Sequence, residues 1–476
     1  MDHTDLYIDG AFRPGAAGAR FDVIDPADES VLASVASAEV EDAEAALDAA
    51  ARAFPAWAAR TPRERAEILR KAFELMSARR DDFARLITRE NGKAGADARG
   101  EATYAAEFFR WFSEEAVRAD GHLGRAPASG ARILVQHKPA GIAVLITPWN
   151  YPAAMGTRKI APALAAGCPV VIKPASETPL TMLALMPLLE EAGVPPGVVN
   201  VLPSRRTGAI VDHMLHDSRV RVVSFTGSTG VGRTLLRGAA DQVLKPAMEL
   251  GGNAPLLVLH DADVDVAVEG AMLAKMRNLG EACTAANRFY VHERVAEPFV
   301  ARFTERMAAL KVGNGLDPEV DVGPLVNADT RDKVAAFVAD AVAKGARVRL
   351  GGRRPDGPGF FYPPTVLTDV PDDADCLRDE IFGPVAAIQT FTDEEDAIRR
   401  ANDTEYGLVA YVFTRDMARG LSVCERLDYG MVGLNRGLVS DPAAPFGGVK
   451  QSGLGREGGH EGLFEFMESQ YVSASW

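Results

Sequence analysis

The chain has 476 residues, more than one hydrophobic core ordinarily organises, so two or three structural units are expected. Hydrophobic residues make up 47% and charged residues 25%, as in an ordinary folded protein. The net charge of −14 argues against nucleic acid as the main partner, because phosphate binding requires clustered lysine and arginine.

The first 120 residues are predicted to start with a short strand at 6–8 and a turn at Asp9-Gly10, followed by a helical run. Thr61-Pro62-Arg63-Glu64 has the pattern of a capping box with proline at the first helical position. Apolar residues recur with helical spacing at 40–59, 73–86 and 102–117.

Strands and helices then alternate, after a segment at 122–140 that reads as extended. Strands are predicted at 142–146, 170–172, 198–202 and 220–225, with helices at 158–166, 180–192, 208–215 and 233–240. Alternation at this spacing indicates βαβ units and a parallel sheet. A second α/β unit is expected beyond Asn253, with strands near 255–259, 288–292, 391–392 and 411–414.

The apolar tail at 464–476 reads as an extended segment. An exposed apolar end strand is prone to unwanted pairing, so we expect it to pair with the segment after His122 or with another subunit.

Three features favour a cytoplasmic protein. No apolar stretch reaches the length of a membrane span. The start, Met1 to Asp5, lacks the basic and apolar regions of a secretory signal. The cysteines are widely scattered without metal-ligand spacing, which suits a reducing compartment and predicts no metal site; they are Cys168, Cys283, Cys376 and Cys424.

A glycine-rich turn, Phe225 to Gly232, follows a predicted strand and precedes a predicted helix. Its glycines would let backbone N–H groups approach a phosphate at the positive end of the helix. The spacing Gly227, Gly230, Gly232 differs from the dinucleotide fingerprint, so a tight strand–helix turn is an equal alternative.

Three polar residues are ambiguous when each is taken alone. Cys283 is either a small buried hydrophobe or a reactive thiolate in a glycine-flanked, polar setting. Glu249 is a surface residue or a base with a raised pKa. Asn150 caps a turn or donates its amide N–H to an oxyanion.

Seven ordered motifs remove much of this ambiguity, because together they resemble the aldehyde dehydrogenase superfamily over essentially the whole chain. The motifs are Pro148-Trp149-Asn150, Val171-Ile172-Lys173-Pro174, Phe225-Thr226-Gly227-Ser228, Glu249-Leu250-Gly251-Gly252, Gly280-x-x-Cys283, Glu380-Ile381-Phe382-Gly383-Pro384 and Pro445-Phe446-Gly447-Gly448.

The resemblance implies an α/β fold with two Rossmann-like parallel-sheet domains and a β-arm for oligomerisation. The expected cofactor-binding domain comprises 1–118 and 140–251, and the catalytic domain 252–460. The expected arm comprises 119–139 and 461–476, and it implies a homodimer or homotetramer.

By the same resemblance, Cys283 attacks the aldehyde carbon, and the Asn150 amide with the Cys283 backbone N–H stabilises the alkoxide. Hydride then leaves for the nicotinamide, and water hydrolyses the thioester with Glu249 as general base. The presence of this glutamate favours hydrolytic over CoA-acylating members of the superfamily.

The cofactor residues are also carried over from the motifs. Lys173 is expected to bind the adenine ribose, Glu380 the nicotinamide ribose, and Ser228 after Gly227 the pyrophosphate. Trp149 is expected to line the path of the pyrophosphate. Phe382 is expected to flank the nicotinamide, although taken alone it could equally pack in the core. Many relatives that prefer NAD have glutamate where this chain has Ser176. The small hydroxyl admits a 2′-phosphate, so we expect NADP to be used at least as well as NAD.

Within the superfamily the chain is most similar to succinate-semialdehyde dehydrogenases. The matching stretches include Tyr151 to Lys159, Arg277-Asn278-x-Gly280, Gly437 to Ser440 and Lys450 to Gly458. The resemblance implies that Arg158, Arg277 and Ser440 hold the substrate carboxylate, although the arginines could instead belong to structural ion pairs.

Two departures bear on this assignment. The family often has glutamine in place of Glu281, and a carboxylate there opposes thiolate formation unless it turns away or pairs with an arginine. Ala285 replaces a cysteine that allows a redox-switch disulfide in some relatives. The alternatives are a dehydrogenase for glutarate semialdehyde or an uncharged aldehyde, and a non-enzymatic protein that keeps the fold.

Overall fold

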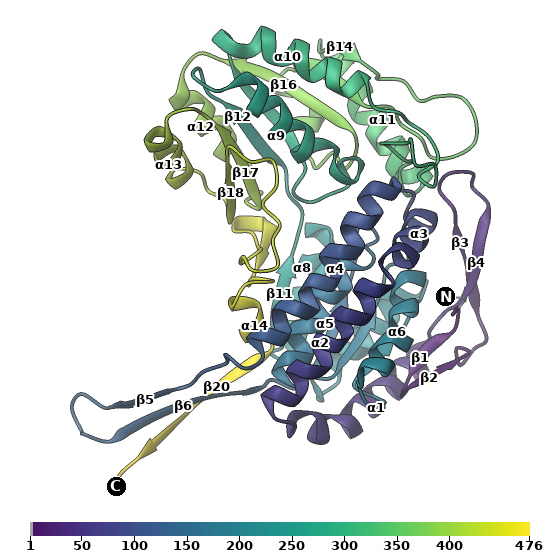
Figure 1. Ribbon diagram of the computed structural model, residues 1–476, viewed down its shortest axis with the longest axis vertical. Helices are drawn as coiled ribbons and strands as arrows, with labels where there is room; N and C mark the ends of the chain where they lie inside the picture. Colours follow the sequence, from purple (N-terminus) through teal and green to yellow (C-terminus); the bar gives the residue numbers. More distant parts are fainter. Residues whose placement is uncertain (1–2) are drawn as a thin grey trace.

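The computed structural model describes residues 3–476. Met1 and Asp2, the start of the segment interpreted as lacking a secretory signal, lie outside the described residues. Two α/β units lie one above the other in Figure 1, and a narrow β-sheet that contains the C-terminal strand projects from the lower unit. Among residues 3–476, no helix has the length and apolar character needed to cross a membrane.

The first unit is built on an eight-stranded sheet in the order β19-β11-β10-β7-β8-β9-β1-β2. Its strands are β1 (Leu6–Ile8), β2 (Ala11–Arg13), β7 (Ile142–Ile146), β8 (Val170–Lys173), β9 (Val199–Val201), β10 (Val220–Thr226), β11 (Lys245–Glu249) and β19 (Gly453–Leu454). The five strands from β11 to β9 are parallel, as the alternating pattern predicts.

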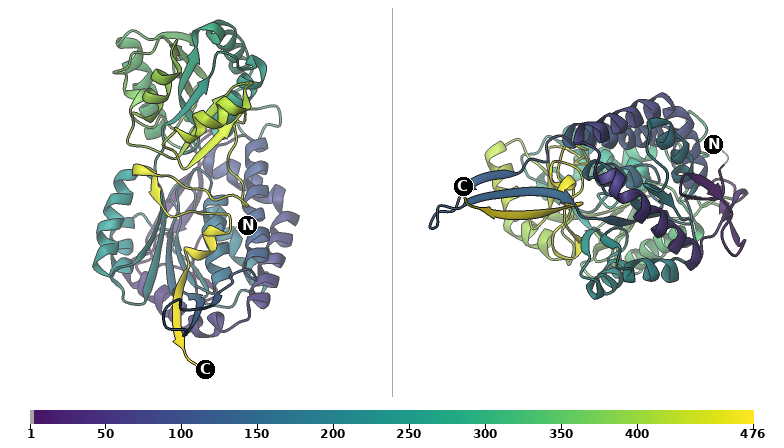
Figure 2. Two further views of the ribbon diagram at one scale, coloured as in Figure 1. Left: turned by 90° about the vertical axis from the view of Figure 1, so that its left-hand side faces the viewer. Right: turned by 90° about the horizontal axis from the view of Figure 1, so that it is seen from below.

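Both faces of this sheet are covered by helices, which explains why its central strands are apolar throughout. Ile142 and Val144 pack in one core with α1 (Val40–Ala58), α7 (Thr207–His216) and α8 (Thr229–Asp241). Ala143 and Leu145 point the other way. They pack in a second core with α2 (Pro62–Ala78), α3 (Arg80–Asn91), α4 (Gly95–Glu115), α5 (Ala154–Ala166) and α6 (Leu180–Ala192). Figure 2 shows the sheet between these two helical layers.

The second unit has a seven-stranded sheet in the order β14-β15-β16-β13-β12-β17-β18. Its strands are β12 (Ala254–Val258), β13 (Ala286–His292), β14 (Arg347–Leu350), β15 (Thr365–Thr368), β16 (Val385–Phe391), β17 (Val409–Phe413) and β18 (Met431–Leu434). The helices are α9 (Val264–Met276), α10 (Glu293–Ala308), α11 (Ala328–Ala343), α12 (Glu394–Asn402) and α13 (Met417–Glu425).

The projecting sheet has the order β20-β6-β5 and joins the chain's C-terminal end to a segment in its first third. β20 (Met467–Ala474), after the short helix α14 (Glu461–Phe464), pairs antiparallel with β6 (Arg132–Pro139), and β6 pairs with β5 (His122–Arg125). The prediction that the tail pairs with the segment after His122 is therefore confirmed.

Two local predictions near the N-terminus are wrong. The segment after Gly10 is not a helical run; it contains β2 and a separate hairpin of β3 (Arg20–Ile24) and β4 (Val31–Ala36). β3 alternates exposed and buried residues, the pattern of a half-buried strand. The helix expected at 73–86 is interrupted, because Arg79 ends α2 and precedes α3 with non-helical angles.

Other predictions hold closely. The strand at 142–146 and the helix at 180–192 have the predicted bounds. The capping box is formed, since the Glu64 N–H donates to the Thr61 hydroxyl and the Thr61 N–H to the Glu64 carboxylate. The strand expected at 391–392 is longer and begins earlier, at Val385.

Candidate active site

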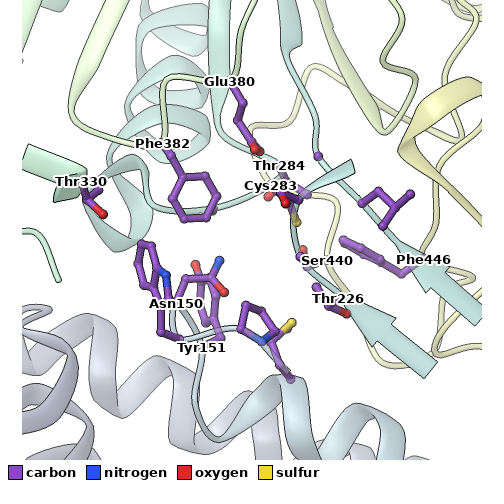
Figure 3. A pocket seen from close by; sticks show the side chains of 18 of the residues that line it. Asn150, Tyr151, Thr226, Cys283, Thr284, Thr330, Glu380, Phe382, Ser440 and Phe446 are labelled. Carbon is purple, nitrogen blue, oxygen red and sulfur yellow. The ribbon is translucent and has the colours of Figure 1, made fainter. Parts of the chain in front are cut away.

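A cavity of about 220 Å³ lies between the two α/β units, beyond the carboxyl ends of β7, β10 and β11. This is where open parallel sheets ordinarily bind their ligands. Residues from both units line it, and Figure 3 shows Asn150, Glu380, Phe382 and Phe446 around Cys283.

The loop that carries Cys283 runs from the end of α9 to β13 and begins with unusual backbone angles. Asn278 and Leu279 have φ values of 53° and 60°, a left-handed conformation that is strained for residues other than glycine. The Asp97 carboxylate accepts the Asn278 N–H at 2.8 Å and so stabilises this start. The loop places Cys283 in the wall of the cavity, and none of the other three cysteines lines it.

The surroundings of Cys283 favour the protonated form of its thiol. Burial raises the pKa of Cys283 to about 12, and the carboxylate of Glu380 adds to the shift. Arg158 and Arg277 act in the opposite direction but do not balance it. The proton must therefore leave when ligands change the surroundings of the sulfur or when a base accepts it.

Asn150 follows β7 and reaches the loop of Cys283 from the first unit. Its side-chain N–H donates to the backbone oxygen of Glu281 at 3.0 Å, two residues before Cys283. The amide oxygen of Asn150 is buried and has no hydrogen-bond partner within residues 3–476. One amide hydrogen thus holds the loop, and the second remains available to a ligand.

Glu249, the last residue of β11, lies behind the cavity wall rather than in it. Burial raises its pKa well above the ordinary value, and nearby Glu457 adds to this. Neither carboxyl oxygen has a hydrogen-bond partner in the described chain, so no contact locks this side chain. A Cβ at Gly447 would lie 2.9 Å from one of these oxygens, so the glycine leaves room for the carboxyl group.

The carboxyl group of Glu281 is directed away from Cys283. Its carboxyl accepts the backbone N–H of Val326 at 3.1 Å, and no arginine pairs with it in residues 3–476. Burial raises the pKa of Glu281 to about 8, so this group is largely neutral at pH 7. Because its carboxyl group is directed away and is largely neutral, Glu281 does not oppose formation of a thiolate at Cys283.

An aromatic pair and a carboxyl group form another wall. The rings of Trp149 and Phe382 meet edge to face, with centroids 5.3 Å apart. Phe382 has a φ of 57°, so its backbone is strained in order to present the ring. One oxygen of Glu380 accepts the Gly252 N–H at 3.2 Å, and burial raises the pKa of Glu380 to about 7.

The remaining candidate cofactor residues fall in two places. Gly227 and Ser228 line the first cavity, and Ser228 is the N-cap of α8, where the helix dipole favours an anion. Ser176 lines a second cavity of about 300 Å³ together with Arg205. The buried Lys173 lines neither cavity, burial lowers its pKa to about 8, and its ammonium group has no partner among the described residues. An unpartnered buried cation and an open helix N-terminus both fit a phosphorylated dinucleotide.

The two candidate substrate arginines have different surroundings. Arg277 makes only long contacts, at 3.4 Å to the Thr284 hydroxyl and 3.5 Å to the Ser440 hydroxyl, and no carboxylate pairs with it in the described part of the chain. Arg158 donates to the Tyr104 hydroxyl at 2.6 Å and approaches Glu457 at 3.4 Å. Arg158 is thus partly committed to a structural pair, whereas Arg277 is not.

Sequence reasoning assigned no role to the buried pair of Lys159 and Glu457, which lies beside Glu249. Lys159 also donates to the Ser224 hydroxyl at 2.9 Å. The sequence feature that could have indicated this pair is a lysine within α5, a helix whose residues are all buried. Its partner Glu457 lies 298 residues away in the sequence, so only the fold shows that the two are paired.

Comparison with known proteins identifies the family. The model of the "Aldehyde dehydrogenase family" matches residues 12–472. The chain is 57% identical over 442 residues to a succinate-semialdehyde dehydrogenase of Paenarthrobacter nicotinovorans, covering 93% of this chain and 98% of that protein. It is 47% identical over 465 residues to the NADP(+) succinate-semialdehyde dehydrogenase of Escherichia coli K12, covering 98% and 96%.

A solved structure, described as an E. coli NADP dependent enzyme, superposes with a TM-score of 0.98 at 46% identity, covering 100% of this chain and 98% of that one. The chain therefore belongs to the aldehyde dehydrogenase family, and it is an NAD(P)-dependent oxidoreductase. The predicted fold class and family resemblance are confirmed.

Proposed function

We propose that this enzyme oxidises succinic semialdehyde to succinate, with Cys283 as nucleophile. The observation that carries the proposal is that Cys283, Asn150 and Arg277 line one cavity, and that no carboxylate pairs with Arg277 in the described residues 3–476. The cavity therefore combines a group that attacks an aldehyde with a cation that binds a carboxylate.

The chemistry starts when the thiol of Cys283 releases its proton to solvent. The sulfur then bonds to the aldehyde carbon, and the carbonyl oxygen becomes an alkoxide. The free amide hydrogen of Asn150 and the Cys283 backbone N–H donate to that oxygen; losing one such donor typically costs on the order of 10²–10³ in rate. A bound nicotinamide would supply the hydride acceptor, so that the carbon bonded to Cys283 becomes the carbonyl of a thioester. Water then cleaves the thioester, and Glu249 accepts its proton.

The side chain of Glu249 is suited to the role of general base, because it is free to change its rotamer. A general base must reach the cavity after hydride transfer, and within residues 3–476 no hydrogen bond holds the Glu249 carboxyl behind the wall. Burial raises the pKa of Glu249, which makes its carboxylate a stronger proton acceptor once it is ionised.

We infer that the cofactor lies along the wall of Trp149, Phe382 and Glu380, with its pyrophosphate at Gly227 and Ser228. Lys173 and Ser176 would hold the adenine ribose, and Ser176 leaves space for a 2′-phosphate. NADP should therefore serve at least as well as NAD. A specificity constant for NAD at least tenfold above that for NADP would overturn this assignment, and that ratio corresponds to about 1.4 kcal/mol.

We also propose that 119–139 and 461–476 act as an arm that joins subunits of a dimer or tetramer in the cytoplasm. The outer edges of the projecting sheet are unpaired within residues 3–476, and Tyr471 and Trp476 are 59% and 75% exposed. Such an edge calls for a partner strand. In this division, 1–118 with 140–251 bind the cofactor and 252–460 carry the catalytic cysteine.

The test is the absorbance of reduced nicotinamide, followed with both cofactors and a panel of aldehydes. Succinic semialdehyde should give a specificity constant at least tenfold above that for butanal, which has the same carbon count and no carboxylate. Equal activity on the two would reject the substrate, while turnover of no aldehyde at all would reject the catalytic assignment.

A further inference from the structure

Helix α4 runs behind the candidate active site. It contacts the loop that carries Cys283 and the segment that follows Asn150. Asp97 and Glu101 are one helical turn apart, so their side chains share a face. Asp97 accepts the Asn278 N–H from the nucleophile's loop. Glu101 accepts the N–H groups of Ala153 and Ala154 at 2.8 and 3.3 Å, at the start of α5.

A buried ion pair links this face to Asn150. The Lys93 ammonium lies 2.5 Å from the Glu101 carboxylate, and the two side chains are 1% and 0% exposed. Lys93 also donates to the backbone oxygen of Asn150 at 2.7 Å and lies 4.1 Å from the centre of the Tyr151 ring. Asn278 donates to the same Asn150 oxygen at 3.0 Å.

These contacts fix the main chain of Asn150 from three directions. Its carbonyl accepts two donors, Lys93 and Asn278, and the turn that follows is held by Glu101. A fully buried ion pair contributes little net stability, because desolvation offsets most of its attraction. The ion pair of Lys93 and Glu101 is thus better explained by its positioning of the Asn150 main chain than by a contribution to the stability of the fold.

We propose that Lys93 and Glu101 are positioning residues that aim the Asn150 amide at the developing alkoxide. This inference rests on the proposed role of Asn150. Oxyanion donors work because they are oriented in advance, and a displacement of about 1 Å can cost on the order of 10²-fold in rate. Neither residue lines the cavity, so each would act through the segment from Asn150 to Ala154 that it contacts.

The experiment is a double-mutant cycle on the pre-steady-state burst of reduced nicotinamide with succinic semialdehyde and NADP. Asn150→Ala should lower the burst rate on the order of 10²–10³-fold. Lys93→Met keeps the length of the side chain and removes its charge, and it should lower the burst rate tenfold or more. The affinity for NADP, measured by fluorescence titration, should change less than twofold.

The decisive variant carries both changes. If Lys93 acts through Asn150, the double variant should have a burst rate within about threefold of Asn150→Ala alone, because residues in one network do not add. Multiplying losses would overturn the inference, as would an unchanged burst in Lys93→Met. An unchanged burst in Asn150→Ala would instead reject the proposed oxyanion donor, and this inference with it.

Arg65→Met is the matched control. Arg65 is another buried cation, 5% exposed, that donates to the backbone oxygen of Ala165 away from the site. Its loss should lower the melting temperature and leave the burst rate within twofold. Should Lys93→Met fail to fold, Glu101→Gln keeps the shape and removes the charge; it should slow the burst several-fold and show the same non-additivity, and additive losses there would overturn the inference.

Discussion

At the scale of single residues, the surroundings of the two cavity arginines determine how each should respond to substitution. Arg158 shares Glu457 with Lys159, so removing its charge also disturbs a buried ion pair. Arg277 has only two hydroxyls within reach among residues 3–476, and the hydrogen bonds to them are long. Substitution of Arg277 should therefore lower the affinity for substrate with less loss of stability than substitution of Arg158.

Arg277→Met should raise KM for succinic semialdehyde on the order of 10–100-fold, because a hydrogen bond to a charged group contributes about 1.5–3 kcal/mol. Its activity on butanal should change less than threefold, since that aldehyde has no carboxylate. Steady-state kinetics with both aldehydes measure this. A parallel loss on both would show that Arg277 supports the site rather than the substrate.

Glu281 should make stability depend on pH. In the folded chain burial raises its pKa to about 8, whereas an unfolded glutamate ionises near 4.5. Between these values folding takes up a proton, so the free energy of unfolding falls as pH rises through this range. Glutamine has no such proton, so Glu281→Gln should gain melting temperature relative to the parent between pH 5 and pH 8. An offset that stays constant with pH would show that Glu281 is ionised in the folded state.

At the scale of elements, the capping box of α2 offers a stability test far from the chemistry. Thr61→Ala removes the hydroxyl that accepts the Glu64 N–H and should lower the free energy of unfolding by about 1 kcal/mol. Thr103→Ala, on the exposed surface of α4, is the control and should cost less, because it removes no cap. Urea unfolding measures both, and equal losses would contradict the capping account.

The same scale shows why some elements were predictable. The helix at 180–192 has an apolar stretch ended by Gly193 in the left-handed conformation, so its bounds follow from local sequence. The break at Arg79 has no proline or glycine to announce it, and it depends on how α2 and α3 pack on their neighbours. The strands β3 and β4 are short, with five and six residues and only two buried residues each, so their apolar pattern is hard to recognise in the sequence.

The candidate site was predictable where the family motifs are contiguous. Cys283, Asn150 and Arg277 were identified from their motifs, and the structure brings them to one cavity. The partners that hold them were not found, because hydrogen bonds such as that from Lys93 to Asn150 join segments 57 residues apart. Contacts of this kind follow from tertiary packing, and local propensity does not encode them.

At the scale of the whole molecule, the projecting sheet should determine assembly. Deleting residues 467–476 removes β20 and exposes the inner edge of β6, so the subunit contact should weaken. Light scattering after size exclusion should give a multiple of 50.8 kDa for the full chain and a lower multiple for the deletion. An unchanged mass for the shortened chain would show that the arm does not join subunits.

We propose that the two units meet to form a site for covalent catalysis at Cys283, with Glu249 as general base. Glu249→Gln should transfer hydride once and then stall, because the thioester lacks its base. Intact-protein mass spectrometry after mixing with succinic semialdehyde and NADP, followed by peptide mapping, should find one succinyl group per chain, on Cys283. A variant that turns over many times without accumulating this adduct, or that carries it on another cysteine, would contradict the account.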